Sequence, residues 1–246
     1  MTLKKLDNKV VMVWGGSGGT GFPMAQVFLE AGAKVVIIGR DLSKLTAAQA
    51  RLGFENTLAV QADASSKEGV MRAFEDTETD FGKPDLVIAI VGGAKDWERN
   101  FPDTDTKELA ASLARLRAAF VSPLQNILEV AEGYSVEKSG GWLIHFSSHV
   151  VQKDESVLPG NKTYRESKTE ADTMVLNLAD KHHDTKIRFT NLRPAIILTG
   201  ANTELLNTPE KRAGAVRPET MAEWIIENFD NPDVPGAQLF DSDIVV

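Results

Sequence analysis

The chain has 246 residues, of which 42% are hydrophobic and 25% are charged, a balance typical of a globular protein with a full core. Its formal net charge is −8, so we expect no general attraction to nucleic acid or to an anionic membrane surface. The sequence contains no cysteine, which excludes disulfides, thiolate nucleophiles and cysteine-based zinc sites. The four histidines have no familiar ligand spacing, so no metal site is predicted.

Short runs rich in valine and isoleucine alternate with longer amphipathic stretches along the chain. They predict strands over residues 10–14, 34–38, 57–61, 86–91, 142–146, 187–192 and 238–240. Between them lie predicted helices over residues 20–31, 42–52, 67–81, 106–132, 164–181 and 218–229. This alternation predicts a doubly wound α/β fold, with a mostly parallel sheet of about seven strands and helices on both faces. No linker or repeat interrupts the series, so we expect one domain spanning residues 1–246.

The start of the chain carries no pattern of an export signal, because polar residues follow the first lysines without an apolar stretch of sufficient length. The first apolar run, residues 10–14, is far too short to span a bilayer. We therefore expect a cytoplasmic protein with no membrane partner.

The first predicted strand runs directly into a glycine-rich turn, and a predicted helix follows. Glycines at such a junction let the chain turn sharply, let a pyrophosphate approach the backbone and let helix and strand pack closely. The helix start offers free N–H groups and a positive dipole end to phosphate. The turn predicts a dinucleotide-binding fold of the Rossmann type, with binding by Gly15, Ser17, Gly18, Gly19, Thr20 and Gly21.

The end of the second strand bears on the choice of cofactor. An NAD site usually places an acidic residue at this strand tip, but here the position is Gly39, and Arg40 follows. A guanidinium can hold a 2′-phosphate through charge-assisted hydrogen bonds, so we expect NADP(H) to be preferred and NAD(H) to remain possible. The alternative is that Arg40 only begins a solvated edge and that Asp41 binds the ribose.

Tyr164 and Lys168 stand four residues apart at the start of the helix that follows the fifth strand, and so share one face of it. A nearby ammonium stabilises a phenolate, so we expect the pKa of Tyr164 to lie below its reference value of about 10. Tyr164 is then a candidate acid for carbonyl reduction and a candidate base for alcohol oxidation. A hydroxyl of Ser147 or Ser148, at the end of the preceding strand, could hold the substrate oxygen.

Over nearly its whole length the chain resembles the short-chain dehydrogenase/reductase family in its short, single-domain form. Residues 14–21 are similar to the family's Thr-Gly-x-x-x-Gly-x-Gly, with Trp14 in place of the threonine. The resemblance implies a catalytic set of Ser148, Tyr164 and Lys168, with Lys168 also binding the nicotinamide ribose. It further implies cofactor contacts from Asp63, Ala64 and Gly92, and from a segment from Pro194 to Thr199 that is similar to Pro-Gly-x-x-x-Thr.

The resemblance implies hydride transfer between the nicotinamide of NADP(H) and a small carbonyl or alcohol. Substrate loops are expected at residues 93–103, 150–162 and 200–214, beyond the carboxyl ends of the strands. Relatives of this type commonly pair long helices between subunits, so a homodimer or homotetramer is expected.

Several positions depart from the family pattern. The family's Asn-Asn-Ala-Gly reads Ala89-Ile90-Val91-Gly92 here. If Phe120 sets the register of the long helix, Arg115 takes the place of the family's helix asparagine. The glycine spacing and residues 191–194, Asn-Leu-Arg-Pro, also echo longer epimerase and dehydratase relatives, although the chain lacks the length for their substrate domain. A second hypothesis stays open, that of a catalytically silent NADP(H)-binding sensor or scaffold.

Overall fold

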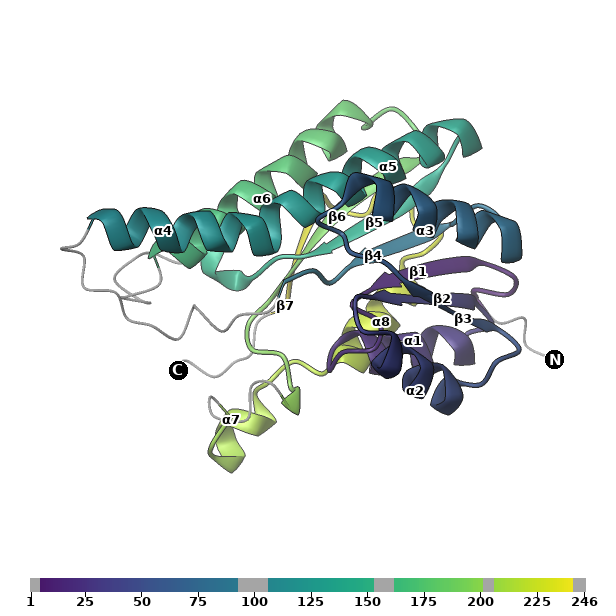
Figure 1. The fold of residues 1–246 in the computed structure, drawn as a ribbon, viewed down its shortest axis with the longest axis horizontal. Helices are drawn as coiled ribbons and strands as arrows, with labels where there is room; N and C mark the ends of the chain where they lie inside the picture. The colour runs from purple at the N-terminus through teal and green to yellow at the C-terminus, as the bar shows by residue number, and fades with distance from the viewer. Residues whose placement is uncertain (1–4, 93–105, 153–161, 201–205, 241–246) are drawn as a thin grey trace.

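A seven-stranded sheet forms the centre of the protein (Figure 1). The computed structural model describes residues 5–92, 106–152, 162–200 and 206–240. The strand order is β3-β2-β1-β4-β5-β6-β7, and all six neighbouring pairs run parallel, which confirms the predicted fold class. The strands are β1 (Val10–Trp14), β2 (Lys34–Gly39), β3 (Thr57–Gln61), β4 (Leu86–Ala89), β5 (Gly141–Phe146), β6 (Ile187–Pro194) and β7 (Ala237–Phe240).

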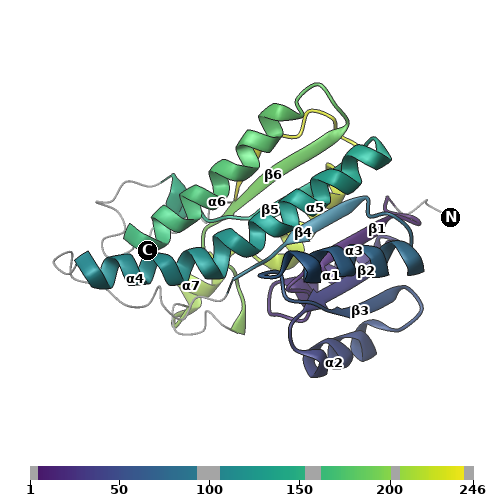
Figure 2. The same ribbon diagram turned by 45° about the horizontal axis from the view of Figure 1, so that its top comes forward.

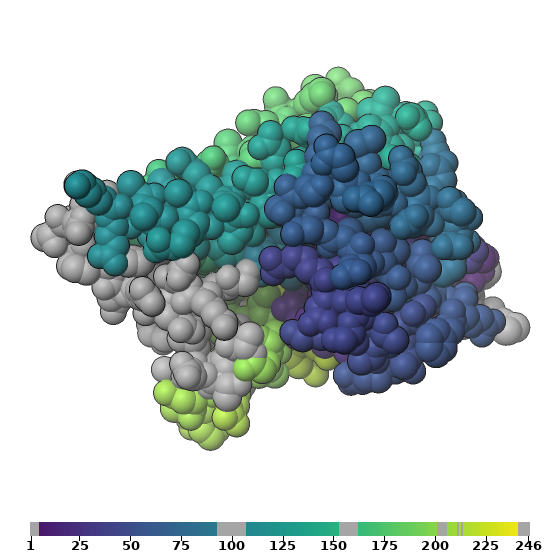
Figure 3. Space-filling view, viewed as in Figure 1, coloured from purple at the N-terminus to yellow at the C-terminus, as the bar shows by residue number. Residues whose placement is uncertain are grey.

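Helices cover both faces of this sheet (Figures 1 and 2). One face carries α1 (Gly21–Glu30), α2 (Leu42–Leu52) and α8 (Pro218–Glu227), and the other carries α3 (Lys67–Asp80), α5 (Ser122–Lys138) and α6 (Lys162–Lys181). The remaining elements are α4 (Thr106–Leu116), the π-helix η1 (Arg117–Val121), the 3₁₀-helix η2 (His149–Val151) and α7 (Pro209–Ala213). The helix α4 lies at one end of the long axis of the molecule (Figure 3). Within the described ranges, no helix combines the length and apolarity needed to cross a membrane.

The alternation of side chains along β1 explains why both faces are covered. Val11 and Val13 pack into the core beneath α1 and α8, whereas Met12 and Trp14 pack into the core beneath α3, α5 and α6. Every residue of β1 is buried, because successive side chains of a strand point to opposite faces and each face meets a helical layer. The apolar strands of the sequence are therefore interior strands of a parallel sheet.

Most of the predicted elements have bounds in the structure that differ by one or more residues. The fourth strand ends at Ala89 rather than at residue 91, and the sixth continues to Pro194, where it still pairs with Phe240 of β7. The single long helix predicted over residues 106–132 is α4, η1 and α5 in succession, and it continues to Lys138. It ends there because Ser139 adopts the left-handed conformation, with a φ of +59°.

The order of the strands creates a crevice between β1 and β4. The chain proceeds from β1 outward to β3 on one side, and from β4 outward to β6 on the other. Ligands bind to such sheets at this reversal, outside the carboxyl ends of the strands. Because all strands are parallel, the residues that follow β1, β2, β3, β4 and β5 all reach this same edge.

Truncating a central strand side chain tests the importance of this core. Ile88 of β4 is fully buried, so we expect Ile88→Ala to lower the free energy of unfolding by about 2–5 kcal/mol in urea denaturation. Leu239→Ala on β7 is the control, because that side chain is 39% exposed and its loss should cost under about 1 kcal/mol. Equal losses in the two variants would contradict the assignment of Ile88 to the core.

Candidate active site

The glycine turn lies at the carboxyl end of β1 and is anchored to the neighbouring strand. The backbone N–H groups of Gly15 and Gly16 donate to the carbonyl of Ile38, at N–O distances of 2.8 and 3.3 Å. The helix α1 begins at Gly21, directly after the turn, so its positive dipole end faces the crevice. The residues present therefore fit a dinucleotide pyrophosphate.

The segment after β6 approaches the same turn. A Cβ atom added to Gly19 would lie 3.1 Å from Cβ of Thr199, so the turn and this segment pack tightly at position 19. Pro194 ends β6 and accepts a hydrogen bond through its carbonyl from Nδ1 of His149 (3.2 Å). The structure thus brings Thr199 to the glycine turn and ties Pro194 to η2, next to Ser148.

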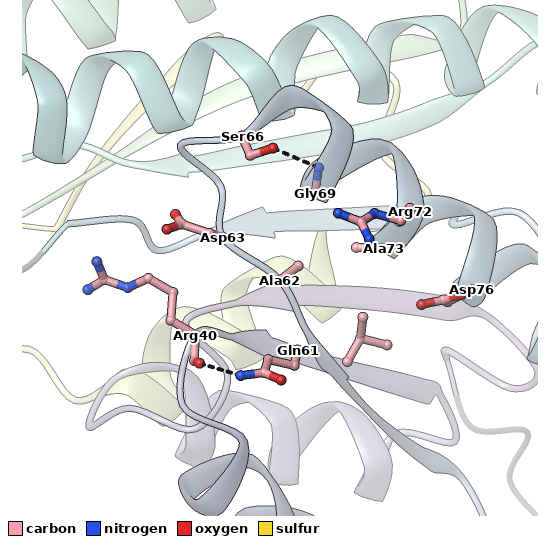
Figure 4. A pocket seen from close by; sticks show the side chains of 10 residues that line it. Arg40, Gln61, Ala62, Asp63, Ser66, Gly69, Arg72, Ala73 and Asp76 are labelled. Atoms are coloured by element: carbon pink, nitrogen blue, oxygen red, sulfur yellow. Dashed lines mark hydrogen bonds between the residues drawn. The ribbon is translucent and has the colours of Figure 1, made fainter.

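Arg40 and Asp63 meet at the carboxyl ends of β2 and β3, at one end of a cavity of about 400 Å³ (Figure 4). Arg72 and Asp76 of α3 lie at its other end. The carboxylate of Asp63 accepts from the backbone N–H of Ser65 (2.9 Å), and hydrogen bonds from Ser65 together with the charge of Arg40 lower its pKa. This cavity can hold an anionic or polar group between an arginine and an ionised carboxylate.

Two neighbouring side chains are already engaged by the fold. The carboxylate of Asp41 caps α2, accepting from the backbone N–H of Lys44 (3.1 Å) and from the hydroxyl of Ser43 (2.6 Å). Asn126 of α5 donates to the carbonyl of Ala64 (2.9 Å) and so fixes the loop after β3. Asn126 has no motif around it in the sequence, and only its contact with this loop relates it to the site.

Ser148 and Tyr164 are brought together at the carboxyl end of β5, although they lie on different elements. A hydrogen bond between their hydroxyl groups lowers the pKa of Tyr164, but withdrawal of the phenol from water is the larger effect and raises it to about 12. The expectation of a tyrosine pKa below 10 is therefore wrong for this structure, because burial outweighs the stabilisation of the phenolate. Tyr164 is held as a neutral phenol, which is the form that can donate a proton.

Lys168 is 4% exposed and lies one helical turn after Tyr164. Its ammonium donates to the carbonyl of Phe146 at the end of β5 (3.1 Å) and lies over the ring of Phe120, 4.4 Å from the centroid. Burial lowers the pKa of Lys168 to about 8, and the charge of Asp172 acts in the opposite direction. The site therefore contains a buried ammonium held by a carbonyl and an aromatic face.

Phe120 is a member of this site that the sequence did not reveal as one. It lies in the π-helix η1, and its ring also packs edge-on against Tyr164 at a centroid distance of 5.8 Å. Gly92 makes room for it: the φ of Gly92 is +105°, and an added Cβ would lie 2.0 Å from the Phe120 ring. A π-helix adds a residue to the helical turn and is frequent at functional sites.

The structure also shows which side chain of the long helix reaches the lysine. Arg115, which the sequence placed at the position of the family's helix asparagine, is exposed, whereas Phe120 is buried against Lys168. An aromatic ring from the next helical turn therefore contacts the ammonium in this chain.

Parts of the predicted substrate loops lie outside the described residues. The loop 93–103 does so entirely, as do residues 153–161 of the loop 150–162 and residues 201–205 of the loop 200–214. Among the residues that the structure does describe, no group of three or more His, Asp or Glu side chains is arranged to hold a metal ion.

Comparison with known proteins identifies the family. Residues 9–210 match the family model described as short chain dehydrogenase, and the chain belongs to the short-chain dehydrogenase/reductase family. The matched residues include the glycine turn and Ser148, Tyr164 and Lys168. The family is one of NAD(P)-dependent oxidoreductases, and the sequence-based prediction of the family is confirmed.

Individual relatives share either a low identity with the chain or a match over less than half of it. An uncharacterized oxidoreductase of Staphylococcus aureus (strain USA300) is 24% identical over 92% of this chain and 93% of its own. Oxidoreductase asL5 of Sarocladium schorii is 38% identical over 37% of this chain and 36% of its own. The NADP-dependent (R)-specific alcohol dehydrogenase of Lentilactobacillus kefiri is 37% identical over 42% of this chain and 41% of its own.

A solved structure supports the fold. A short-chain type dehydrogenase/reductase from Mycobacterium ulcerans superimposes with a TM-score of 0.81 at 20% identity, covering 95% of this chain and 88% of its own. At this level of identity the likeness concerns the architecture alone.

The buried ammonium of Lys168 makes stability depend on pH. Its pKa falls from 10.5 in the unfolded chain to about 8 in the fold, so below pH 8 the charge is buried at a cost. We expect Lys168→Met to stabilise the protein by about 3 kcal/mol at pH 7, and this gain to fade as the pH rises from 8 to 10.5. Urea unfolding at pH 7 and pH 10 measures both.

Lys181→Met is the matched control, because this lysine lies on the same helix and its side chain is 62% exposed. Its effect on the free energy of unfolding should be small and equal at the two pH values. A gain for Lys168→Met that is unchanged at pH 10 would show that burial of the charge is not its cause.

Proposed function

We propose that the protein is an NADP(H)-dependent oxidoreductase that transfers a hydride between the nicotinamide and a small carbonyl or alcohol, with Tyr164 as the acid/base. The observation that carries this proposal is the hydrogen bond between Ser148 and Tyr164, which is made beside the buried ammonium of Lys168. The three side chains come from the end of β5 and the start of α6, at the edge where the glycine turn lies.

In the direction of reduction, the residues of the chain bind the substrate oxygen and supply the proton. The carbonyl oxygen would accept hydrogen bonds from Ser148 and Tyr164. The chemistry that NADPH would supply here, when bound, is a hydride for the carbonyl carbon. The electron pair of the C=O π bond moves to the oxygen, which takes the proton of Tyr164. The ammonium of Lys168 stabilises the tyrosinate that this leaves, until water returns a proton to it.

Two features of the chain and the name of one relative support a preference for NADP(H). Arg40 lies at the tip of β2 and is exposed, so its guanidinium is accessible to a 2′-phosphate. Asp41 is engaged in capping α2, which disfavours its use as a ligand of the ribose hydroxyl. The Lentilactobacillus kefiri relative is named as NADP-dependent. The proposal also includes a cytoplasmic location and a homodimer or homotetramer, both of which rest on the sequence.

Replacing the phenol tests the catalytic role. We expect Tyr164→Phe to lower kcat by about 10²–10⁴-fold, because the proton donor is lost, while the NADPH dissociation constant stays within about twofold. Turnover of NADPH is measured over a panel of ketones, aldehydes, quinones and enones, and binding by the fluorescence of NADPH.

The control is Tyr134→Phe, because Tyr134 is the other of the two tyrosines and packs from α5 against Phe74 of α3. Its kcat should match that of the wild type. Retained turnover in Tyr164→Phe would refute the role of the phenol. Tight NADPH binding by a wild type that reduces nothing in the panel would favour the sensor or scaffold hypothesis.

Replacing the arginine at the tip of β2 tests the cofactor preference. We expect Arg40→Ala to raise the KM for NADPH about 10–100-fold and to leave the KM for NADH nearly unchanged, because only NADPH carries the 2′-phosphate. Arg51→Ala on α2 makes the same change of charge at an exposed position and serves as the control. A wild type that prefers NADH, or equal effects on the two cofactors, would contradict this assignment.

A further inference from the structure

A buried ion pair lies one helical turn beyond Lys168. Asp172 of α6 accepts two hydrogen bonds from the guanidinium of Arg193 on β6, from Nε to Oδ1 (3.0 Å) and from Nη2 to Oδ2 (2.5 Å). The two side chains are 5% and 12% exposed. Buried ion pairs contribute little net stability, because desolvation offsets the attraction between the charges. Stability alone therefore does not account for this pair.

Neighbouring strands hold the ion pair in place. Asn191 of β6 donates to the backbone carbonyl of Asp172 (2.9 Å), and its side-chain oxygen bonds Nδ1 of His145 on β5 (2.9 Å). Burial and the nearby charge of Lys168 lower the pKa of His145 to about 3, so His145 is neutral at physiological pH. The position of Asp172 is thereby fixed relative to β5 and β6, and α6 packs beside β6 (Figure 2).

Within the described residues, the groups that surround Lys168 come from α6, β5 and η1. On α6 it has Tyr164 and Asp172 as titratable neighbours, one turn to either side. From β5 it meets the carbonyl of Phe146 and the neutral His145, and from η1 the ring of Phe120. Asp172 is the carboxylate whose charge acts on the ammonium, and both of its oxygens are bound by Arg193.

We propose that Asp172 and Arg193 are positioning residues that act on catalysis through Lys168, an inference that rests on the proposed function. Asp172 supplies the negative charge that keeps Lys168 protonated in a buried site. Arg193 binds that carboxylate on both oxygens, so the ammonium stays on the Phe146 carbonyl, on the side of Tyr164, and does not turn to pair with Asp172. Arg193 belongs to the Asn-Leu-Arg-Pro segment that is similar to epimerase and dehydratase relatives, and this proposal gives that arginine a positioning role.

This arrangement predicts opposite effects for the two charges. Asp172→Asn removes the carboxylate whose charge acts on Lys168, so the proton of Lys168 is lost more easily. Arg193→Gln leaves the carboxylate of Asp172 with Lys168 as its neighbouring cation, so that proton is held more tightly. Charged neighbours within a few ångströms shift a pKa by about one unit or more. Damage to packing alone would lower activity in both variants without moving their pH dependence in opposite directions.

The test is the pH profile of kcat/KM for carbonyl reduction by the full chain with NADPH. The alkaline limb of the wild type should lie near pH 8, where Lys168 loses its proton. We expect this limb to move down by about one pH unit in Asp172→Asn and up by about one unit in Arg193→Gln. Arg193→Lys keeps the charge and should restore the wild-type limb, and the charge-neutral double variant Asp172→Asn/Arg193→Gln should lie between the single variants.

Glu170→Gln is the matched control, because Glu170 lies on the same helix and pairs outward with Arg117. Its alkaline limb should coincide with that of the wild type. If Asp172→Asn does not fold, the comparison of Arg193→Gln with Arg193→Lys still tests the proposal, because only Arg193→Gln should move the alkaline limb. Limbs that stay at the wild-type pH, or that move in the same direction in both single variants, overturn the proposal.

A second readout does not depend on turnover. NMR titration of ¹⁵N- and ¹³C-labelled lysine, with the Lys168 signal assigned from Lys168→Met, reports the protonation of Lys168 directly. Opposite shifts in the two variants together with moved kinetic limbs support the proposal, and the absence of opposite shifts overturns it even in an active enzyme. If the wild type shows no turnover but the two variants still show opposite NMR shifts, the proposed function, and with it the catalytic role of the pair, has failed, although the electrostatic link exists.

Discussion

The parallel direction of all seven strands is the constraint on which the site depends. Parallel strands end at one common edge of the sheet. Residues between positions 15 and 199 that are far apart in the sequence therefore meet at this edge. Parallel sheets occur where both faces are covered. Here helices cover both faces, and every residue of β1 is buried. The apolar core and the active site are therefore products of the same arrangement.

Burial also decides the electrostatics of the site. The same withdrawal from water raises the pKa of Tyr164 and lowers that of Lys168, so both groups are held closer to their neutral forms. A neutral phenol is suited to donating a proton, whereas a lysine that is easily deprotonated needs a nearby negative charge to remain an ammonium. The ion pair of Asp172 and Arg193 lies where such a charge is required. The buried charge of Lys168 thus lowers the stability of the fold while it serves the proposed function.

Phe120 connects the loop after β4 with the proposed catalytic side chains. The glycine that survives after β4 is Gly92, and it makes room for the ring of Phe120. The π-helix turns that ring onto Lys168 and Tyr164. The ammonium of Lys168 is therefore held by a cation–π contact with Phe120 and by a hydrogen bond to a backbone carbonyl. Gly92 and the π-helix are therefore parts of one packing arrangement around Lys168.

The sequence by itself determined the succession of strands and helices along the chain, the glycine turn, and the placement of Tyr164 and Lys168 on one helix face. Each of these follows from local periodicity, turn chemistry or helical spacing. It also placed Arg40, Asp63 and Ser148 at strand ends, which parallel pairing then brings to one edge. Only the tertiary structure decided the tyrosine pKa, the contact of Phe120 with Lys168 and the partnership of Asp172 with Arg193. Those depend on burial and on contacts between residues far apart in the chain, and neither propensity nor spacing encodes how deeply a side chain is removed from water.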